Sequence, residues 1–429
     1  MRQRVRMLAH LLAGVTLLTT SVPVAAAPAS AAPTMRCTSP SEKLLPEVPW
    51  THQRLTPQRV WPLTRGEGVL VAVIDTGVDG AVPQLAGRVR KGSDVVNRMG
   101  RADDDCYGHG TFVAGIIAAQ PAAGTGMVGL APGVTILPVR QANGPSDGTA
   151  STLARSIRAA VDANASVINV SASSFFPNEE LRRAVEYAAQ RDVLLVAAVA
   201  NEAQQGNPVA YPAAYPQVVA VGSVGPDGRR SEFSEVGTYL DLVAPGVDVV
   251  SLSRAGAGHL VDSGTSYATP FVTATAALVR AYHPKLTAAQ VKRRLELTAD
   301  HPGTTLPNPQ LGWGVVNPYQ AVTAILPEEH GHHSTPVDQP TLGPVARTAA
   351  EPTSDRDTAI EFTLAAVVVA ALLGLVAYLV PHGIRRSWRS VGEPGAEAAP
   401  DPGSGRVPHR ENRYPGTSDP DRNGRGSTG

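Results

Sequence analysis

The 429-residue chain has little of what several protein classes require. It has only two cysteines, too few for a disulfide scaffold or an all-cysteine zinc site, although they can form one bridge. It has no excess of positive charge, because 37 Lys and Arg residues balance 37 Asp and Glu residues, and this argues against binding to nucleic acid. A hydrophobic content of 43% and a charged content of 17% exclude a wholly disordered chain and a polytopic membrane protein.

The N-terminus has the parts of a secretory signal peptide. Three arginines precede an apolar stretch over residues 7–27, and small residues follow it. We expect residues 1–31 to be the signal peptide, cleaved between Ala25 and Ala32. The alternative is an uncleaved membrane anchor, which the polar residues within the stretch disfavour.

Near the C-terminus, residues 362–380 are uncharged and mostly apolar. As a helix they would span roughly 28 Å, close to the ~30 Å hydrocarbon core of a bilayer. Acidic residues precede the stretch and arginines follow it. The positive-inside rule therefore predicts a single-pass transmembrane helix over 360–380, with a cytoplasmic, disordered tail over 381–429 and everything upstream outside. The alternative is a buried core helix, but no amphipathic helices flank the stretch.

A segment rich in Pro, Thr and small residues, 327–359, precedes the predicted span. This composition predicts an extended, semi-rigid stalk. The segment contains His330, His332 and His333, which can bind a metal weakly. A solvated histidine cluster on a linker is the simpler interpretation, and we expect no metal site.

From about residue 66 to residue 326, short β-branched runs alternate with longer helical patterns. The first run, 69–74, is continuously apolar, as expected for a strand covered on both faces. Further strands are expected at 134–139, 167–170, 193–199, 218–221 and 239–243, and helices at 110–119, 153–163, 179–190, 269–282 and 288–298. This alternation predicts an α/β fold with a mainly parallel sheet flanked by helices and with functional residues at the carboxyl ends of the strands.

Four polar residues fall where such a sheet would bring them together. Asp75 follows the first strand, where a carboxylate can orient a histidine. His109 opens a helix between two glycines, and Ser266 lies in a loop that runs into an Ala-rich helix, where backbone N–H groups can bind an anion. Asn201 ends a strand and offers a fixed, neutral donor. Each of these residues alone is equally typical of a helix cap or a turn. Together, in this order along the chain, they predict nucleophilic catalysis.

The segments around these residues resemble the signature blocks of subtilisin-like serine proteases. They are residues 71–78 (VAVIDTGV), 108–115 (GHGTFVAG), 197–202 (AAVANE) and 264–270 (GTSYATP). The resemblance, which covers about residues 45–326, implies a three-layer subtilisin-like fold. It implies that Asp75, His109 and Ser266 form a catalytic triad. It also implies that Asn201 helps to bind the oxyanion and that no metal or organic cofactor takes part.

The whole layout is similar to that of the mycosins, membrane-anchored subtilases associated with type VII secretion. The signal peptide, the stalk, the C-terminal span and a cysteine beside the histidine block carry this resemblance. It implies a peptidase domain over 61–326, preceded by an extension over 32–60 that wraps it permanently. It also implies a cell-membrane protein with an extracytoplasmic catalytic domain. Its partners would be peptide or protein substrates, the membrane, and subunits of the secretion membrane complex.

The resemblance also assigns the two cysteines. Cys37 and Cys106 would form a disulfide that ties the extension to the loop before His109, and an unpaired thiol beside the site is the alternative. Mycosins usually hold four cysteines in the ectodomain. One bridge would therefore be missing here, near Phe175 and Asn207.

The substrate cleft shows two departures from the subtilase pattern. The resemblance implies that Ser171, Ala172 and Ser173 line the cleft and pair with an extended peptide. Where many subtilases have two glycines next, this chain has Ser173 and Ser174, which should alter or narrow the primary specificity pocket. The residue after the expected nucleophile is Tyr267, where secreted subtilisins commonly have Met.

Two other sequence patterns suggest different sites. Asp75-Thr-Gly and Asp262-Ser-Gly mimic the paired aspartate loops of pepsin-like proteases, but those chains are nearly all-β and would leave His109 without a role. The three aspartates at 103–105 are compatible with a calcium site, although an acidic surface loop is the simpler interpretation.

A rival from another class is a structural subunit of a secretion complex, with proteolysis secondary. Small residues at helical spacing on the predicted span, Ala366, Ala370, Gly374 and Ala377, could seat it against a partner helix. Such residues are equally common in any span. The sequence therefore leaves both roles open.

Overall fold

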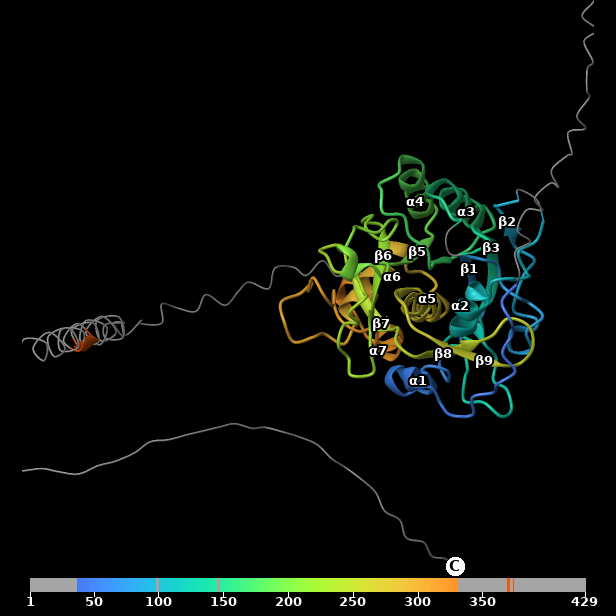
Figure 1. Cartoon of the computed structure of the whole chain (residues 1–429), viewed down its shortest axis with the longest axis horizontal. Helices are drawn as coiled ribbons and strands as arrows, with labels where there is room; N and C mark the ends of the chain where they lie inside the picture. The colour runs from blue at the N-terminus through green and yellow to red at the C-terminus, as the bar shows by residue number, and fades with distance from the viewer. Residues whose placement is uncertain (1–36, 98–99, 145–146, 331–368, 371–372, 374–429) are drawn as a thin grey trace, which may run out of the picture. The chain divides into compact units, whose positions relative to one another are not determined.

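The computed structural model describes residues 37–97, 100–144, 147–330, 369–370 and 373, and Figure 1 shows their elements. The predicted signal peptide, the stalk beyond His330, the tail and all but three residues of the predicted membrane span lie outside these ranges. No helix within the described ranges is long and apolar enough to cross a membrane. The elements below belong to the first of two compact units, of which residues between 37 and 330 are described.

The centre of this unit is a seven-stranded sheet in which every neighbouring pair of strands is parallel. In their order across the sheet, the strands are β2 (Ser93–Asp94), β3 (Thr135–Arg140), β1 (Leu70–Asp75), β4 (Val167–Val170), β5 (Leu194–Ala198), β6 (Val218–Val224) and β7 (Leu242–Pro245). All six positions of β1 are buried, as its continuous apolar run predicts. The α/β class with a mainly parallel sheet is thus confirmed.

Helices cover both faces of the sheet because alternate strand residues face opposite layers (Figure 1). Val71 and Val73 of β1 pack in one core with α2 (His109–Ala118) and α5 (Thr265–Tyr282). Ala72 and Ile74 pack in the other core with α3 (Ala150–Asp162) and α4 (Glu179–Gln190). The first core also contains side chains of α6 (Ala288–Leu297) and α7 (Pro318–Thr323).

Helix α5 is buried without interruption from Tyr267 to Val279, because its Ala and Thr side chains are small enough for neighbours on every side. Its first turn carries Ser266, so this residue sits on one of the most enclosed elements of the fold. Pro270 lies in the second turn of the helix. It has no amide to donate to the carbonyl of Ser266 four residues earlier, and that carbonyl accepts from the Ser171 hydroxyl at 2.9 Å instead.

An antiparallel hairpin of β8 (Val249–Leu252) and β9 (His259–Asp262) lies outside the main sheet and was not expected from the sequence. It packs on α2, where the Ser251 hydroxyl donates to the Phe112 carbonyl at 2.6 Å. The N-terminal extension runs beside β9, and the His259 amide donates to the Lys43 carbonyl at 2.8 Å. The extension continues into α1 (Trp50–Leu55).

Short 3-10 helices complete the unit, at Pro57–Arg59, Pro83–Leu85, Ala203–Gln205 and Pro327–His330. The last of them holds Glu329, whose carboxylate binds the buried guanidinium of Arg294 at 2.6 Å. The folded unit therefore continues through the first residues that the sequence analysis assigns to the stalk.

Candidate active site

Three neighbouring strands end at the same edge of the sheet and bring the expected site residues together. Asp75 is the last residue of β1, Ser171 follows β4, and Asn201 follows β5, and these strands are adjacent in the order β1, β4, β5. Two helices begin at this edge, α2 at His109 and α5 at Thr265, directly before Ser266. All six residues line one cavity of about 350 Å³.

The side chains of Asp75 and His109 are placed as an ion pair that is largely shielded from solvent. The Asp75 side chain is only 3% exposed, and its Oδ1 lies 2.7 Å from Nδ1 of His109. The same Oδ1 accepts a hydrogen bond from the Thr76 amide at 2.8 Å. Because the carboxylate accepts, Nδ1 of the imidazole carries a proton and Nε2 is left as the atom that can take one.

The surroundings of His109 favour its charged form. Burial alone would lower the pKa of His109. The charge and the hydrogen bond of Asp75 outweigh burial, and the charges of Asp105 and Asp262 act in the same direction, so that the pKa lies above its ordinary value of 6.5. The imidazolium that forms when His109 accepts a proton is therefore stabilised by this site.

The Ser266 hydroxyl does not face His109 in this conformation. Its Oγ donates to the Ser171 carbonyl at 3.3 Å, and no hydrogen bond joins it to His109 within the described residues. Ser171 in turn donates its own hydroxyl to the Ser266 carbonyl at 2.9 Å. Rotation about the Cα–Cβ bond of Ser266 is required before its proton can pass to the imidazole, and uncomplexed sites often show such loose geometry.

Among the described residues, Asn201 is held with its side-chain N–H group unpaired. Its Oδ1 accepts two hydrogen bonds from Thr265, from the amide at 2.9 Å and from the hydroxyl at 3.0 Å. These bonds fix the orientation of the side-chain amide, so Nδ2 is the atom that can donate to a ligand. A neutral donor fixed in this way beside Ser266 is suited to bind an oxyanion.

The segment after β4 forms a wall of the cavity. Ser171, Ala172 and Ser173 line it, as does Phe175. The Ser173 hydroxyl donates at 3.4 Å to the carbonyl of Ala198, the last residue of the neighbouring strand β5, so this side chain occupies space that glycine would leave empty. Ser174 is paired with Tyr211 by two backbone hydrogen bonds of 2.8 Å.

The three consecutive aspartates do not act as one acidic surface loop. Asp103 pairs with Arg101, and Asp104 pairs with Arg140 at 2.7 Å. Asp105 is buried at 3% exposure, and the expectation of a solvated loop is wrong for this residue. Within the described residues no group of His, Cys, Asp or Glu is placed to hold a metal ion.

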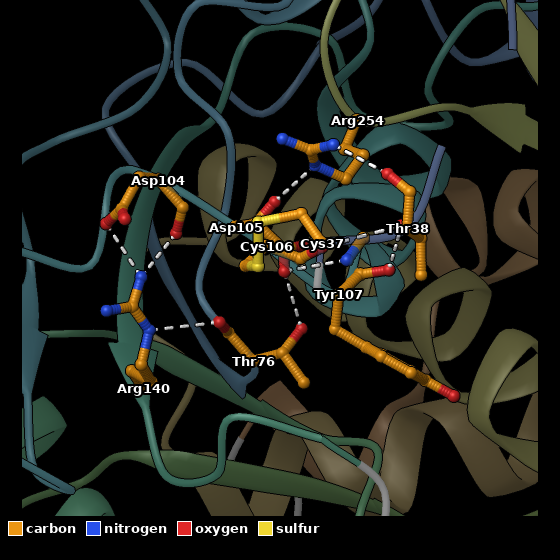
Figure 2. Close-up of a disulfide and its surroundings, with 10 residues drawn as sticks. Cys37, Thr38, Thr76, Asp104, Asp105, Cys106, Tyr107, Arg140 and Arg254 are labelled. Atoms are coloured by element: carbon orange, nitrogen blue, oxygen red, sulfur yellow. Dashed lines mark hydrogen bonds and ion pairs between the residues drawn. A yellow bond between two sulfur atoms is a disulfide. The ribbon is translucent and has the colours of Figure 1, made fainter. Parts of the chain in front are cut away.

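Asp105 joins the loops that carry Asp75 and His109, a role that the sequence analysis missed. It accepts from the Thr76 hydroxyl at 2.9 Å and from the Gly108 amide at 2.8 Å (Figure 2 shows the Thr76 contact). It also accepts from the amide and the hydroxyl of Thr111 in α2, at 2.9 Å and 2.7 Å. The aspartate thus caps α2 from outside, since Gly108 at the N-cap has no side chain to do so.

Cys37 and Cys106 form a disulfide next to this aspartate (Figure 2). Thr38, which follows the first cysteine, donates its hydroxyl to the Tyr107 carbonyl at 2.7 Å. Arg254 links the same two segments, because its guanidinium donates to the Asp105 carbonyl at 2.8 Å and to the Thr38 carbonyl at 2.7 Å. The extension is therefore fastened to the short loop that leads into His109.

Tyr267, which the sequence analysis noted as a departure, packs against His109. The two ring centroids are 5.3 Å apart, and the tyrosine ring also contacts Phe112 at 4.6 Å. Its hydroxyl donates to Asp262 Oδ2 at 2.6 Å. Asp262 therefore pairs with a tyrosine and Asp75 with a histidine, and together with the parallel sheet this excludes the pepsin-like arrangement.

Comparisons with known proteins agree with this geometry. The family model described as the subtilase family, Peptidase S8, matches residues 66–314. Mycosin-4 of Mycobacterium tuberculosis is 38% identical over 364 residues, which cover 74% of this chain and 79% of that protein. Mycosin-1 of Mycolicibacterium smegmatis is 32% identical over 392 residues, which cover 79% of this chain and 85% of that protein.

A solved structure described as the periplasmic assembly from the ESX-5 inner membrane complex contains a similar chain. It is 32% identical, with a TM-score of 0.61, over 68% of this chain and 89% of that chain. The chain belongs to the subtilase family and, within it, to the mycosins. It has the subtilisin-like fold and is a serine-type endopeptidase.

Proposed function

We propose that this endopeptidase is anchored in the cell membrane, faces the extracytoplasmic side and cleaves exported proteins as part of type VII secretion. The observation that carries the proposal is the 2.7 Å contact between His109 and Asp75, with Ser266 and Asn201 on the walls of the same cavity. The link to secretion is supported by the similar chain in the ESX-5 assembly.

In the proposed mechanism, Ser266 Oγ turns toward Nε2 of His109 and attacks the carbonyl carbon of the peptide bond. His109 takes the hydroxyl proton and delivers it to the leaving amine, while Asp75 holds the imidazole in the required tautomer. Asn201 Nδ2 and the Ser266 amide bind the oxygen on which negative charge develops. A water molecule, activated by the same imidazole, then releases the acyl group from the serine.

We propose that the substrate lies in an extended conformation along Ser171, Ala172 and Ser173 and adds a strand at this edge. The contact between Ser173 and the Ala198 carbonyl supports a primary pocket narrower than one lined by glycine. For the parts that lie mostly outside the described ranges, we propose a signal peptide over 1–31, a stalk over the part of 327–359 that follows His330, a membrane span over 360–380 and a cytoplasmic tail over 381–429.

The test is active-site labelling of the full chain in detergent with a fluorophosphonate, followed by peptide mapping. We expect the label on Ser266, and we expect its loss in Ser266→Ala and in His109→Ala. A protein that is folded and accepts no label would contradict the proposal. Label on another serine would contradict the assignment of the nucleophile.

A second candidate function is a structural role in a secretion complex, and the similar chain within the ESX-5 assembly favours it. Ser266→Ala separates the two functions, because it removes the nucleophile and leaves the buried contacts of α5 in place. Secretion supported by this variant at the wild-type level would favour the structural role. Loss of secretion would favour proteolysis.

A further inference from the structure

Glu235 is a buried carboxyl group that the proposed mechanism does not use. Its residue is 0% exposed, and its Oε1 has no hydrogen-bond partner in the described part of the chain. Its Oε2 accepts one long hydrogen bond, from the Tyr239 hydroxyl at 3.3 Å. A charged carboxylate with so few partners is strongly disfavoured in a protein interior, because neither water nor a cation compensates for its lost hydration.

The groups that face Glu235 compensate for a negative charge only in part, because the Tyr239 hydroxyl and the Glu202 backbone amide are outweighed by burial and by the Glu202 carboxylate. Glu202, in the turn after β5, adds a second negative charge nearby, and Tyr239 with Tyr211 behind it is neutral. Of the two arginines that precede it, Arg229 faces Asp227 and Arg230 directs its guanidinium to the Ser234 carbonyl at 2.5 Å, and neither forms an ion pair with Glu235 among the described residues. Burial, followed by the charge of Glu202, raises the pKa of Glu235 to about 7.

Residues 233–236, which include Glu235, bind the turn over 201–207, which begins with Asn201. The Ala203 amide donates to the Phe233 carbonyl at 3.2 Å. Asn207 closes the turn on the residue next to Glu235, donating to the Val236 carbonyl at 2.9 Å and accepting from the Val236 amide at 2.8 Å. Any movement of residues 233–236 is therefore transmitted to the turn.

Glu202 connects this turn directly to Asn201. Its Oε2 accepts a hydrogen bond from the Asn201 amide at 2.7 Å, and its side chain lines the active-site cavity. A second negative charge placed behind Glu202 would repel this carboxylate and disturb its bond to the Asn201 backbone amide. The buried Glu235 and the cavity-lining Glu202 are thus two neighbouring carboxyl groups next to Asn201, the expected oxyanion donor.

We propose that Glu235 is a positioning residue for the oxyanion site, which holds Asn201 in its productive orientation only while the Glu235 carboxyl is protonated. The inference rests on the proposed role of Asn201. Ionisation of Glu235 sets its charge against Glu202, shifts the 201–207 turn and misplaces Asn201 Nδ2. Because an oxyanion donor acts mainly in the transition state, kcat falls and KM changes little.

The protonation states required of His109 and Glu235 determine how activity changes with pH. His109 must be neutral to accept a proton, so activity rises as pH increases through its pKa, which lies above 6.5. Glu235 must be protonated, so activity falls as pH increases through its pKa of about 7. The wild-type protein should therefore have a narrow, bell-shaped profile of kcat against pH, instead of a plateau on the alkaline side.

The experiment measures kcat and KM for a peptide substrate, and the rate of fluorophosphonate labelling, between about pH 5 and about pH 9 in three full-length proteins. They are the wild type, Glu235→Gln and Glu232→Gln. The last is a matched control, because Glu232 lies on the same segment and contacts the same turn through Gln204 at 3.1 Å but is exposed. Glutamine keeps the neutral shape of the protonated glutamate.

We expect the wild type and Glu232→Gln to lose kcat by about tenfold per pH unit on the alkaline side, which amounts to about 10²-fold at pH 9, the lower end of the loss typical of a missing oxyanion donor. Glu235→Gln should keep the acid limb and lack the alkaline limb. An alkaline plateau in the wild type, or an alkaline limb retained in folded Glu235→Gln, overturns the inference. Absence of label on Ser266 at every pH would instead overturn the proposed function.

Discussion

The Asp105 carboxylate accepts a hydrogen bond from the Thr76 hydroxyl at 2.9 Å, which joins the loop after Asp75 to the loop before His109. The geometry of the Asp75–His109 pair therefore depends on a third carboxylate that contacts neither the imidazole nor the cavity. Asp105 stays buried because four donors, from Thr76, Gly108 and Thr111, surround it.

Asp105→Ala should destabilise the fold and reduce activity together. The variant leaves buried donors of Gly108 and Thr111 without their acceptor, and we expect the free energy of unfolding to fall by about 3 kcal/mol. Urea unfolding checks this value. Asp104→Ala is the control, because the Asp104 side chain is 76% exposed and its pair with Arg140 should be worth less than about 1 kcal/mol. Equal losses in both variants would contradict the role given to Asp105.

The Cys37–Cys106 disulfide should contribute to stability mainly by restricting the unfolded chain. It closes a loop with a sequence separation of 69 residues. The chain-entropy relation gives about 4 kcal/mol for a loop of this length. We expect Cys37→Ser with Cys106→Ser to lower the free energy of unfolding by about this amount, and a reductant to lower it equally in the wild type. An additional effect of reductant on the double variant would show that something other than this bond is involved.

Much of this fold can be predicted from the sequence because parallel strands buried on both faces are apolar along their whole length, as β1 is. The hairpin of β8 and β9 could not be predicted in this way, since Leu260 and Val261 in β9 are exposed. Its strands therefore lack both a continuous apolar run and a regular alternation.

The residues that line the cavity were recognisable because Asp75, His109, Asn201 and Ser266 lie in short, dense motifs. The residues that support these side chains from behind were not recognisable in the sequence. Asp105 stands in a run of three aspartates, which in sequence looks solvated, and its burial depends on Thr76 and Thr111, which only the fold brings near. No local pattern signals contacts of this kind between distant segments.

Acid should loosen the N-terminal extension at His259. This side chain is 2% exposed, accepts from the Leu45 amide at Nδ1 at 3.2 Å, and contacts Gln84 Oε1 through Nε2 at 3.0 Å. Protonation would place a second N–H against the Leu45 amide. Burial lowers the pKa of His259 below its ordinary value of 6.5, so the unfolded chain binds the proton more tightly and stability is lost as pH falls below about 6.5.

Hydrogen exchange at the Leu45 amide, measured against pH, checks this prediction. The protection factor of this amide, its intrinsic exchange rate divided by its observed rate, should fall as the solution is acidified, and fall less in His259→Gln. The variant should retain part of the pH dependence of global stability, because burial also lowers the pKa of His52. Protection of Leu45 that does not change between neutral and mildly acidic pH would refute the prediction.

Asp262 should set the position of the acid limb of activity through its charge near His109. It contributes to raising the pKa of His109, so Asp262→Asn should lower that pKa and extend activity to lower pH, as a profile of kcat/KM against pH would show. Tyr267→Phe keeps the ring against His109 and the charge of Asp262 but removes the 2.6 Å bond, so we expect kcat to fall by about two- to tenfold with the acid limb unmoved. Asp103→Asn is the charge control, because Arg101 already pairs with that carboxylate. If Asp103→Asn and Asp262→Asn move the limb equally, the effect belongs to the net charge of the protein and the specific role of Asp262 fails.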